Sequence, residues 1–148
     1  MWNLTPSERL RYWHDFRKKI SEQSKEDAIK ETHHLWCYAP FVSHYLTTDQ
    51  IATWPNPWEL VNDNYYCDLA KSLGMVYTLY LTSHAIESTI EIYRDEISKD
   101  NYNLVYIDGG KYVLNYLHDE VINKKQIQSG LRHIKSITTT DLSLHKLR

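Results

Sequence analysis

A cysteine, a histidine and a carboxylate follow one another along this sequence in an order that could support catalysis. Cys67 stands directly before Asp68, where a periodic apolar run begins, so we expect its thiol in the first turn of a helix. At that position the backbone dipole and the free N–H groups stabilise a thiolate, which is the nucleophilic form of cysteine. His84 and Asp108 come later in the chain. These three residues are the candidate catalytic set of the sequence.

The helix that begins near Cys67 decides whether these side chains can meet. Apolar residues recur there at spacings of three and four, which predicts a helix over residues 65–82. Such a helix places His84 about 25 Å from Cys67 along its axis, too far for direct contact. The alternative is a helix that ends before Gly74, followed by a strand from Met75 to Leu81, because glycine and β-branched residues disfavour a helix.

Two helices are predicted at the start of the chain. Thr5 to Glu8 match a capping box with a proline at the first helical position, which opens a helix over residues 6–21. A second helix is expected over residues 25–36. The basic residues of the first helix lie mostly off its apolar stripe: Arg9, Arg11, Arg17, Lys18 and Lys19. We therefore expect them to face solvent rather than to bind phosphate.

Two tryptophans bracket a stiff Pro-Asn-Pro corner. Asn56 is the expected N-cap and Pro57 the first residue of a short helix over residues 57–61. Trp54 precedes the corner and Trp58 follows it. The corner either packs on the domain's own core or projects towards a neighbouring protein.

The sequence after His84 changes to the alternating pattern of β-strands. Strands are expected over residues 88–94, 102–108 and 111–117. The short Asp-Gly-Gly loop at Asp108 is a strong hairpin signal between the second and third strands. The three strands should therefore form an antiparallel meander.

A last helix is predicted over residues 123–136, although Gly130 weakens it. The tail over residues 142–148 alternates apolar and polar side chains, which suits an added strand or a short helix against a neighbour.

The fold class that follows is α+β, in one domain over residues 1–148. Its N-terminal half, residues 1–83, is mainly helical. Residues 84–118 form the three-stranded antiparallel meander, and residues 119–148 form the C-terminal helix and tail.

Length and charge exclude several classes of protein. A chain of 148 residues suits one domain around one core. The formal net charge is −2 with acids and bases interspersed, so we expect no nucleic-acid partner. The start has no basic region before an apolar run, and no apolar stretch reaches the ~18 residues of a membrane span. We therefore expect neither a signal peptide nor a membrane partner.

No cofactor and no metal site are predicted. Motifs for phosphate loops, dinucleotides, serine hydrolases and zinc proteases are missing from the sequence. His33 and His34 are adjacent, so on a helix they point about 100° apart and cannot share a metal ion. Cys37 and Cys67 are too few for a disulfide framework and fit no zinc spacing. Cys37 is expected to be a small buried apolar residue.

The order Cys67, His84, Asp108 resembles the layout of papain-like and transglutaminase-like enzymes. The resemblance implies acyl transfer or amide hydrolysis, with Cys67 as nucleophile, His84 as general base and Asp108 holding the imidazole tautomer. The neighbours of the cysteine differ from that pattern, because Tyr66 and Asp68 flank it here. The Asp68 carboxylate would also raise the thiol pKa. This set is therefore the alternative, and the favoured interpretation assigns no catalytic residue.

Three stretches of the chain resemble small uncharacterised proteins of tailed bacteriophages: Trp54–Leu60, Tyr66–Leu81 and Gly110–Tyr116. The resemblance implies a viral setting and no mechanism. The chain also has five Trp and twelve Tyr, and aromatic residues suit protein interfaces.

We therefore expect a virion component of the neck, tail or baseplate, made in the host cytoplasm. It would act through contacts with other phage structural proteins or with copies of itself, as part of an oligomer. The interface candidates are Trp2, Trp54, Trp58, Leu144 and Leu147.

Overall fold

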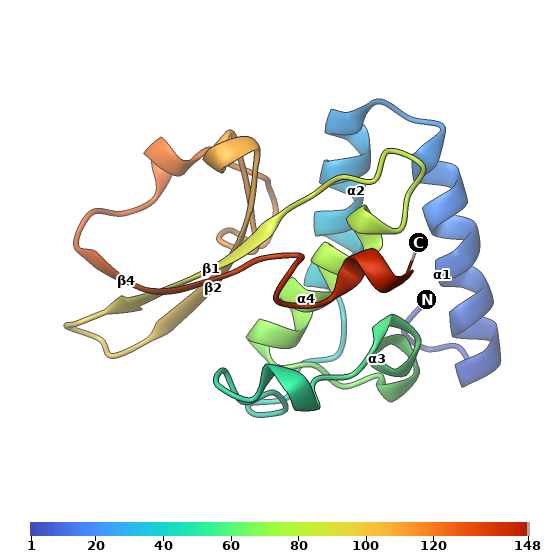
Figure 1. Cartoon of the computed structure of the whole chain (residues 1–148), viewed down its shortest axis with the longest axis horizontal. Helices are drawn as coiled ribbons and strands as arrows, with labels where there is room; N and C mark the ends of the chain where they lie inside the picture. Colours follow the sequence, from blue (N-terminus) through green and yellow to red (C-terminus); the bar gives the residue numbers. More distant parts are fainter. Residues whose placement is uncertain (148) are drawn as a thin grey trace.

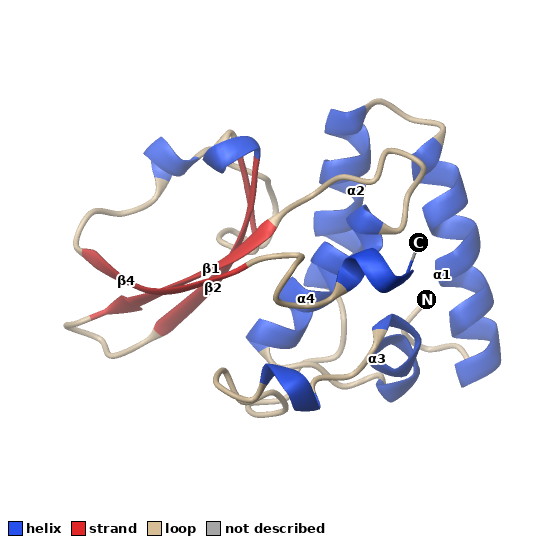
Figure 2. Ribbon diagram, viewed as in Figure 1, coloured by secondary structure: helices blue, strands red, loops and turns tan. Residues whose placement is uncertain are grey.

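Helices occupy one side of the molecule, and an antiparallel sheet extends away from them on the other (Figure 1, Figure 2). The computed structural model describes residues 1–147. The helices are α1 (Pro6–Ser21), α2 (Lys25–Cys37), α3 (Pro57–Asp63) and α4 (Asp68–Tyr80). The strands are β1 (Thr89–Asp95), β2 (Asn101–Ile107), β3 (Tyr112–Leu114) and β4 (Leu131–Ile137). Short 3-10 helices lie between them: η1 (Ile51–Thr53), η2 (Asp108–Gly110), η3 (Lys124–Gln126) and η4 (Leu144–Leu147). The predicted α+β class is confirmed.

The first three helices begin where their capping residues predict. The Thr5 hydroxyl accepts a hydrogen bond from the Glu8 amide, and Glu8 reaches back to the Thr5 amide. At α3, the Asn56 side chain accepts from the Glu59 amide at 2.9 Å, and Glu59 returns a bond to the Asn56 amide. The predicted capping box at Thr5 and the predicted N-cap at Asn56 are therefore confirmed.

Arg9 differs from the expectation for its helix, because it is buried rather than solvent-facing. Its guanidinium donates to the carbonyl oxygens of Val61 at 2.9 Å, Asn62 at 3.1 Å and Leu4 at 2.7 Å. Two of these carbonyls belong to the last turn of α3, whose orphan acceptors favour a cation. Arg9 therefore ties α1 to the C-terminal end of α3.

Helix α4 runs unbroken through Gly74, so the continuous-helix prediction is confirmed and the alternative with a strand from Met75 is wrong. The glycine is needed for packing: a Cβ at this position would lie 2.5 Å from the ring of Trp36. One turn later, the Thr78 hydroxyl accepts hydrogen bonds from the indole N–H groups of Trp13 at 3.0 Å and Trp36 at 2.9 Å. Helices α1 and α2 therefore both dock on the same turn of α4.

The sheet has the order β3-β2-β1-β4, and all of its pairings are antiparallel. Strands β1, β2 and β3 are neighbours in the order of a meander, as predicted, but the sheet has four strands rather than three because β4 pairs with β1. Strand β3 ends at Leu114, before the expected boundary at residue 117, because Asn115 adopts a left-handed backbone with φ of 66°.

The predicted helix over residues 123–136 is wrong, because most of that segment is a turn followed by β4. Ile134 fits a helical stripe in the sequence, yet its side chain is 42 % exposed. Ile137 instead pairs with Ile90 of β1 and is fully buried. Long-range pairing with the open edge of β1 therefore decides the conformation.

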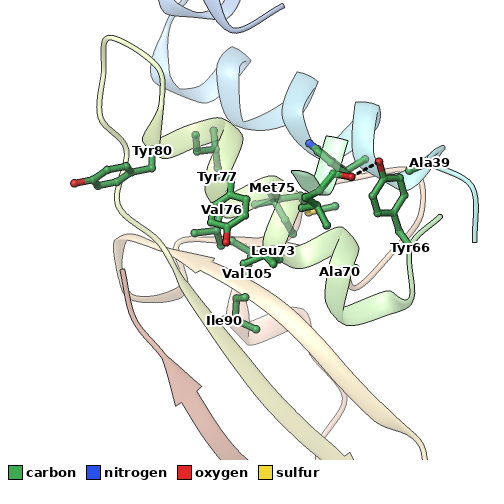
Figure 3. Close-up of a cluster of buried hydrophobic side chains, with 14 of the residues drawn as sticks. Ala39, Tyr66, Ala70, Leu73, Met75, Val76, Tyr77, Tyr80, Ile90 and Val105 are labelled. Atoms are coloured by element: carbon green, nitrogen blue, oxygen red, sulfur yellow. Dashed lines mark hydrogen bonds between the residues drawn. The ribbon is translucent and has the colours of Figure 1, made fainter. Parts of the chain in front are cut away.

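The main core surrounds α4, with α1, α2 and α3 on one side and the sheet on the other. Figure 3 shows Leu73 and Val76 of α4 close to Ile90 of β1 and Val105 of β2. A smaller cluster covers the opposite face of the sheet and contains Leu104, Val113 and Ile122. Helix α4 is buried almost all round, which explains its nearly uniform apolar sequence.

The C-terminal tail folds back on the same chain. Leu144 is 1 % exposed within the main core, and Leu142 and Leu147 pack against that core. The chain's own core therefore covers the apolar side chains of the predicted tail; its last residue, Arg148, lies outside the described residues.

Candidate functional site

The structure does not bring Cys67, His84 and Asp108 together. Cys67 is the N-cap of α4, whereas His84 lies beyond the other end of that helix. Thirteen helical residues separate the two ends, which corresponds to about 20 Å. The implied nucleophile and base therefore cannot make direct contact.

Ordinary structural contacts account for His84 and Asp108. The Nε2 atom of His84 is 2.9 Å from the Gln23 carbonyl oxygen. The Asp108 carboxylate accepts a hydrogen bond from Lys25 Nζ at 2.9 Å. Both residues thus lie at the N-terminal end of α2, away from the thiol.

Cys67 is buried, and its sulfur accepts a hydrogen bond from the Leu46 amide at 3.5 Å. It lines a hollow of about 340 Å³ whose wall is mostly polar, with the residues Ser43, His44, Thr47, Asp49, Asn101 and Asn103 among its lining. Among residues 1–147, the thiol makes no hydrogen bond with an imidazole.

A polar cluster lies beside Cys67 at the first turn of α4. Asp68 Oδ2 accepts a hydrogen bond from the Asn103 side-chain amide at 2.9 Å, and Oδ1 accepts from the Asn115 amide at 3.3 Å. Asn103 comes from β2 and Asn115 follows β3. The carboxylate therefore connects the start of α4 with two parts of the sheet.

Asn115 is the most connected member of this cluster. Its side-chain nitrogen also lies 2.8 Å from the Ser72 hydroxyl and 3.1 Å from the Asn103 carbonyl oxygen. Its left-handed backbone turns the chain away after β3, and asparagine tolerates that conformation better than most residues. The positive φ therefore directs the side-chain amide of Asn115 at the N-terminal end of α4.

Burial shifts the ionisation of the two charged groups at this turn. Removal from water raises the pKa of Asp68, and the two asparagine amides oppose that rise. Burial also lowers the pKa of Lys71, whose Nζ donates to the Cys37 carbonyl oxygen at 3.1 Å. The two opposite charges lie one turn apart on α4 and partly compensate each other.

Cys37 has a partner that the sequence interpretation missed. Its sulfur lies 3.5 Å from a ring nitrogen of His33, which is also buried. Burial raises the pKa of the Cys37 thiol to about 11 and lowers the pKa of His33. The backbone N–H of Asn115 donates a hydrogen bond to His33 Nδ1 at 3.2 Å, so this imidazole helps to position the turn after β3. A neutral thiol and a neutral imidazole form a structural contact here.

A second hollow, of about 200 Å³, also opens onto Asp68. Lys71, Asn115 and Cys37 line it with polar atoms. Phe41 and Leu117 line it with apolar surface and remain 64 % and 41 % exposed. Asp68 is therefore shared by two neighbouring hollows, which together form the candidate binding site.

Four of the five predicted interface residues are used within the chain. Trp2 packs against Trp36 and Tyr66, and its indole N–H donates to the Leu35 carbonyl oxygen at 3.0 Å. Trp54 packs on the core, as do the two leucines of η4: Leu144 and Leu147. Trp58 is 42 % exposed and stays available. The Pro-Asn-Pro corner thus has one tryptophan on the core and the other towards solvent.

The cluster around Asp68 left a weak trace in the sequence. Asn103 lies on the same face of β2 as Val105 and Ile107, which are buried. It is therefore a polar residue on the inner face of the strand. Such a residue needs a polar partner. The sequence alone gives no indication that this partner is Asp68.

No protein-family model and no curated protein matches this sequence. In the described part of the chain, no helix is long and apolar enough to cross a membrane. Within residues 1–147, no three His, Cys, Asp or Glu side chains group in a way that could hold a metal ion.

Proposed function

We propose that this chain is an interaction protein that binds a protein partner through the outer edge of β4. In the setting that the phage resemblance implies, it is a virion component of the neck, tail or baseplate. The observation that carries the proposal is the open edge of β4. Among the described residues, this strand pairs with β1 alone, so its other side offers unpaired backbone groups. An extended segment of a partner can complete such an edge.

The side chains of β4 favour a partner of a particular charge. Arg132 and His133 are exposed, and Lys135 is partly so. Arg132 already pairs with Glu96 of the turn after β1, so the preference of this edge for an acidic partner segment rests on Lys135.

Exposed apolar side chains mark the same end of the sheet. Ile97, in the turn between β1 and β2, is 95 % exposed, and Ile134 is 42 % exposed. Ile134 is also the unpaired residue where the register between β1 and β4 shifts, which turns it out of the ladder. The end of the sheet that carries the turn between β1 and β2 projects away from the helices (Figure 1). A partner could therefore bury both isoleucines without disturbing the core.

The test is copurification with the particles of the phage that encodes the chain, together with light scattering of the purified protein. We expect a fixed stoichiometry in particles and a monomer in isolation. Ile134→Asp combined with Lys135→Glu should remove the protein from particles. Tyr12→Asp, a change of an exposed residue on α1, should leave it in place. The proposal fails if the unaltered protein is absent from particles, or if the β4 double variant is retained like the control.

A further inference from the structure

We propose that the two hollows around Asp68 form a binding site for a neutral saccharide. This inference is independent of strand addition at β4, because it concerns the first turn of α4 and the start of β2, whereas β4 lies on the other side of β1.

The polar groups of the smaller hollow offer both acceptors and donors. Each Asp68 oxygen accepts a hydrogen bond from an asparagine side chain and has a second lone pair. The Lys71 ammonium uses one of its donors on the Cys37 carbonyl oxygen and has others to offer. Neighbouring hydroxyl groups, which both donate and accept, match such a pair better than a purely anionic or cationic group does.

The charges of the smaller hollow disfavour strongly charged ligands. Lys71 and Asp68 line it with opposite charges, next to His118. A phosphate would be attracted by the ammonium and repelled by the carboxylate, and an amine would meet the reverse. A ligand without net charge avoids both penalties while it satisfies the buried polar atoms.

An aromatic ring stands beside these polar groups. Phe41 lines the smaller hollow and is 64 % exposed, which is unusual for a phenylalanine. The electron-rich face of an aromatic ring attracts the weakly positive C–H hydrogens of a flat neighbour. A sugar ring has a C–H face and a rim of hydroxyl groups, so it can use Phe41 and Asp68 at the same time.

The sizes of the hollows indicate short segments of a glycan. The smaller one, about 200 Å³, lies below the ~300–1,000 Å³ range of sites for drug-sized ligands, so we expect it to hold one ring. The larger one, about 340 Å³, is lined by hydroxyl and amide side chains such as Thr47 and Asn101, and by His44 and Asp49, which also exchange hydrogen bonds with hydroxyl groups. Since Asp68 lines both, adjacent rings of one chain could occupy them.

The experiment is an NMR titration of the ¹⁵N-labelled protein with glucose, galactose and N-acetylglucosamine. Sorbitol, an open-chain polyol, is the control ligand because it has hydroxyl groups but no ring face. We expect saturable shifts at Lys71 and Asn115 for at least one sugar, with affinity at least about tenfold higher than for sorbitol. The absence of saturable shifts there for every sugar, or equal affinity for sorbitol, overturns the proposal.

Variants separate binding from folding. Phe41→Ala alters an exposed ring and should reduce affinity by about tenfold or more, whereas Trp58→Ala, a matched change of an exposed aromatic residue, should not. Asp68→Asn keeps the size of the side chain and should abolish binding while the dispersion of the spectrum shows that the fold persists. Equal effects of the Phe41 and Trp58 changes would overturn the proposal, whatever the behaviour of the Asp68 variant.

Discussion

The ring of Trp36 fills the space where a side chain at Gly74 would begin, with a distance of 2.5 Å from the ring to the position of a Cβ. A glycine inside a helix costs about 1 kcal/mol relative to alanine. Here that cost is offset because α2 can approach α4 closely enough for the Trp36 indole to reach Thr78. The same approach buries Trp36 completely.

Gly74→Ala should therefore destabilise the protein despite its better helix propensity. Trp36 would have to move away, and overpacking of this kind costs about 1–3 kcal/mol. Urea unfolding followed by tryptophan fluorescence measures the change. A gain in stability, as expected for an exposed helical glycine, would contradict the packing role.

Thr78 provides a second test of the same junction. Thr78→Val keeps the shape of the side chain but leaves the indole N–H groups of Trp13 and Trp36 without their acceptor. Each buried donor without a partner costs about 1–3 kcal/mol, so we expect a clear loss in the free energy of unfolding. Thr78→Ser retains the hydroxyl and is the control. Similar stability of the Val and Ser variants would show that these hydrogen bonds contribute little.

Elements with local signals could be predicted from the sequence. The capping boxes at Thr5 and Asn56 placed two helix starts, and the loop at Asp108 placed a turn between strands. Strand β4 could not be predicted in this way. Its residues fit a helical stripe, and the edge of β1 that recruits it lies about forty residues earlier in the chain.

The candidate site is missed for the same physical reason. Asp68, Asn103 and Asn115 come from α4, β2 and the turn after β3, and only the packing of the helix on the sheet brings them together. The sequence correctly predicted a helix start beside Cys67, and the thiol was therefore the candidate functional group. Asp68, one position later, makes the polar contacts of the site.

Arg9 gives a third prediction, since it is a buried cation held by three carbonyl oxygens. Arg9→Met should destabilise the protein by about 2–4 kcal/mol, because the end of α3 loses its donors in a buried place. Arg11→Met removes an exposed arginine from the same helix and should change stability by no more than about 0.5 kcal/mol. Thermal unfolding of both variants makes the comparison. Equal effects would mean that Arg9 has no special structural role.

The cysteines give a fourth prediction. Both are buried, and burial raises the pKa of Cys37 to about 11. Iodoacetamide should therefore modify the folded protein slowly near pH 7 and modify the urea-unfolded protein fast. Mass spectrometry of the modified peptides identifies each site. Fast modification of Cys67 in the folded protein would support the alternative hypothesis of a cysteine-dependent activity.

The pH dependence of stability gives the last prediction, because burial raises the pKa of Asp68 above its ordinary value of 3.8. Between these two pKa values the folded protein holds a proton that the unfolded chain releases. The contribution of Asp68 to stability is therefore present below pH 3.8 and is lost as the pH rises through the folded pKa.

Asp68→Asn cannot titrate, so the difference in unfolding free energy between the unaltered protein and this variant isolates the effect. Other carboxylates, such as Asp95 with its lowered pKa, cancel in that difference. Urea unfolding across the acidic range should show the unaltered protein losing stability relative to the variant as the pH rises, and the reverse slope would mean that the hydrogen bonds from Asn103 and Asn115 outweigh burial.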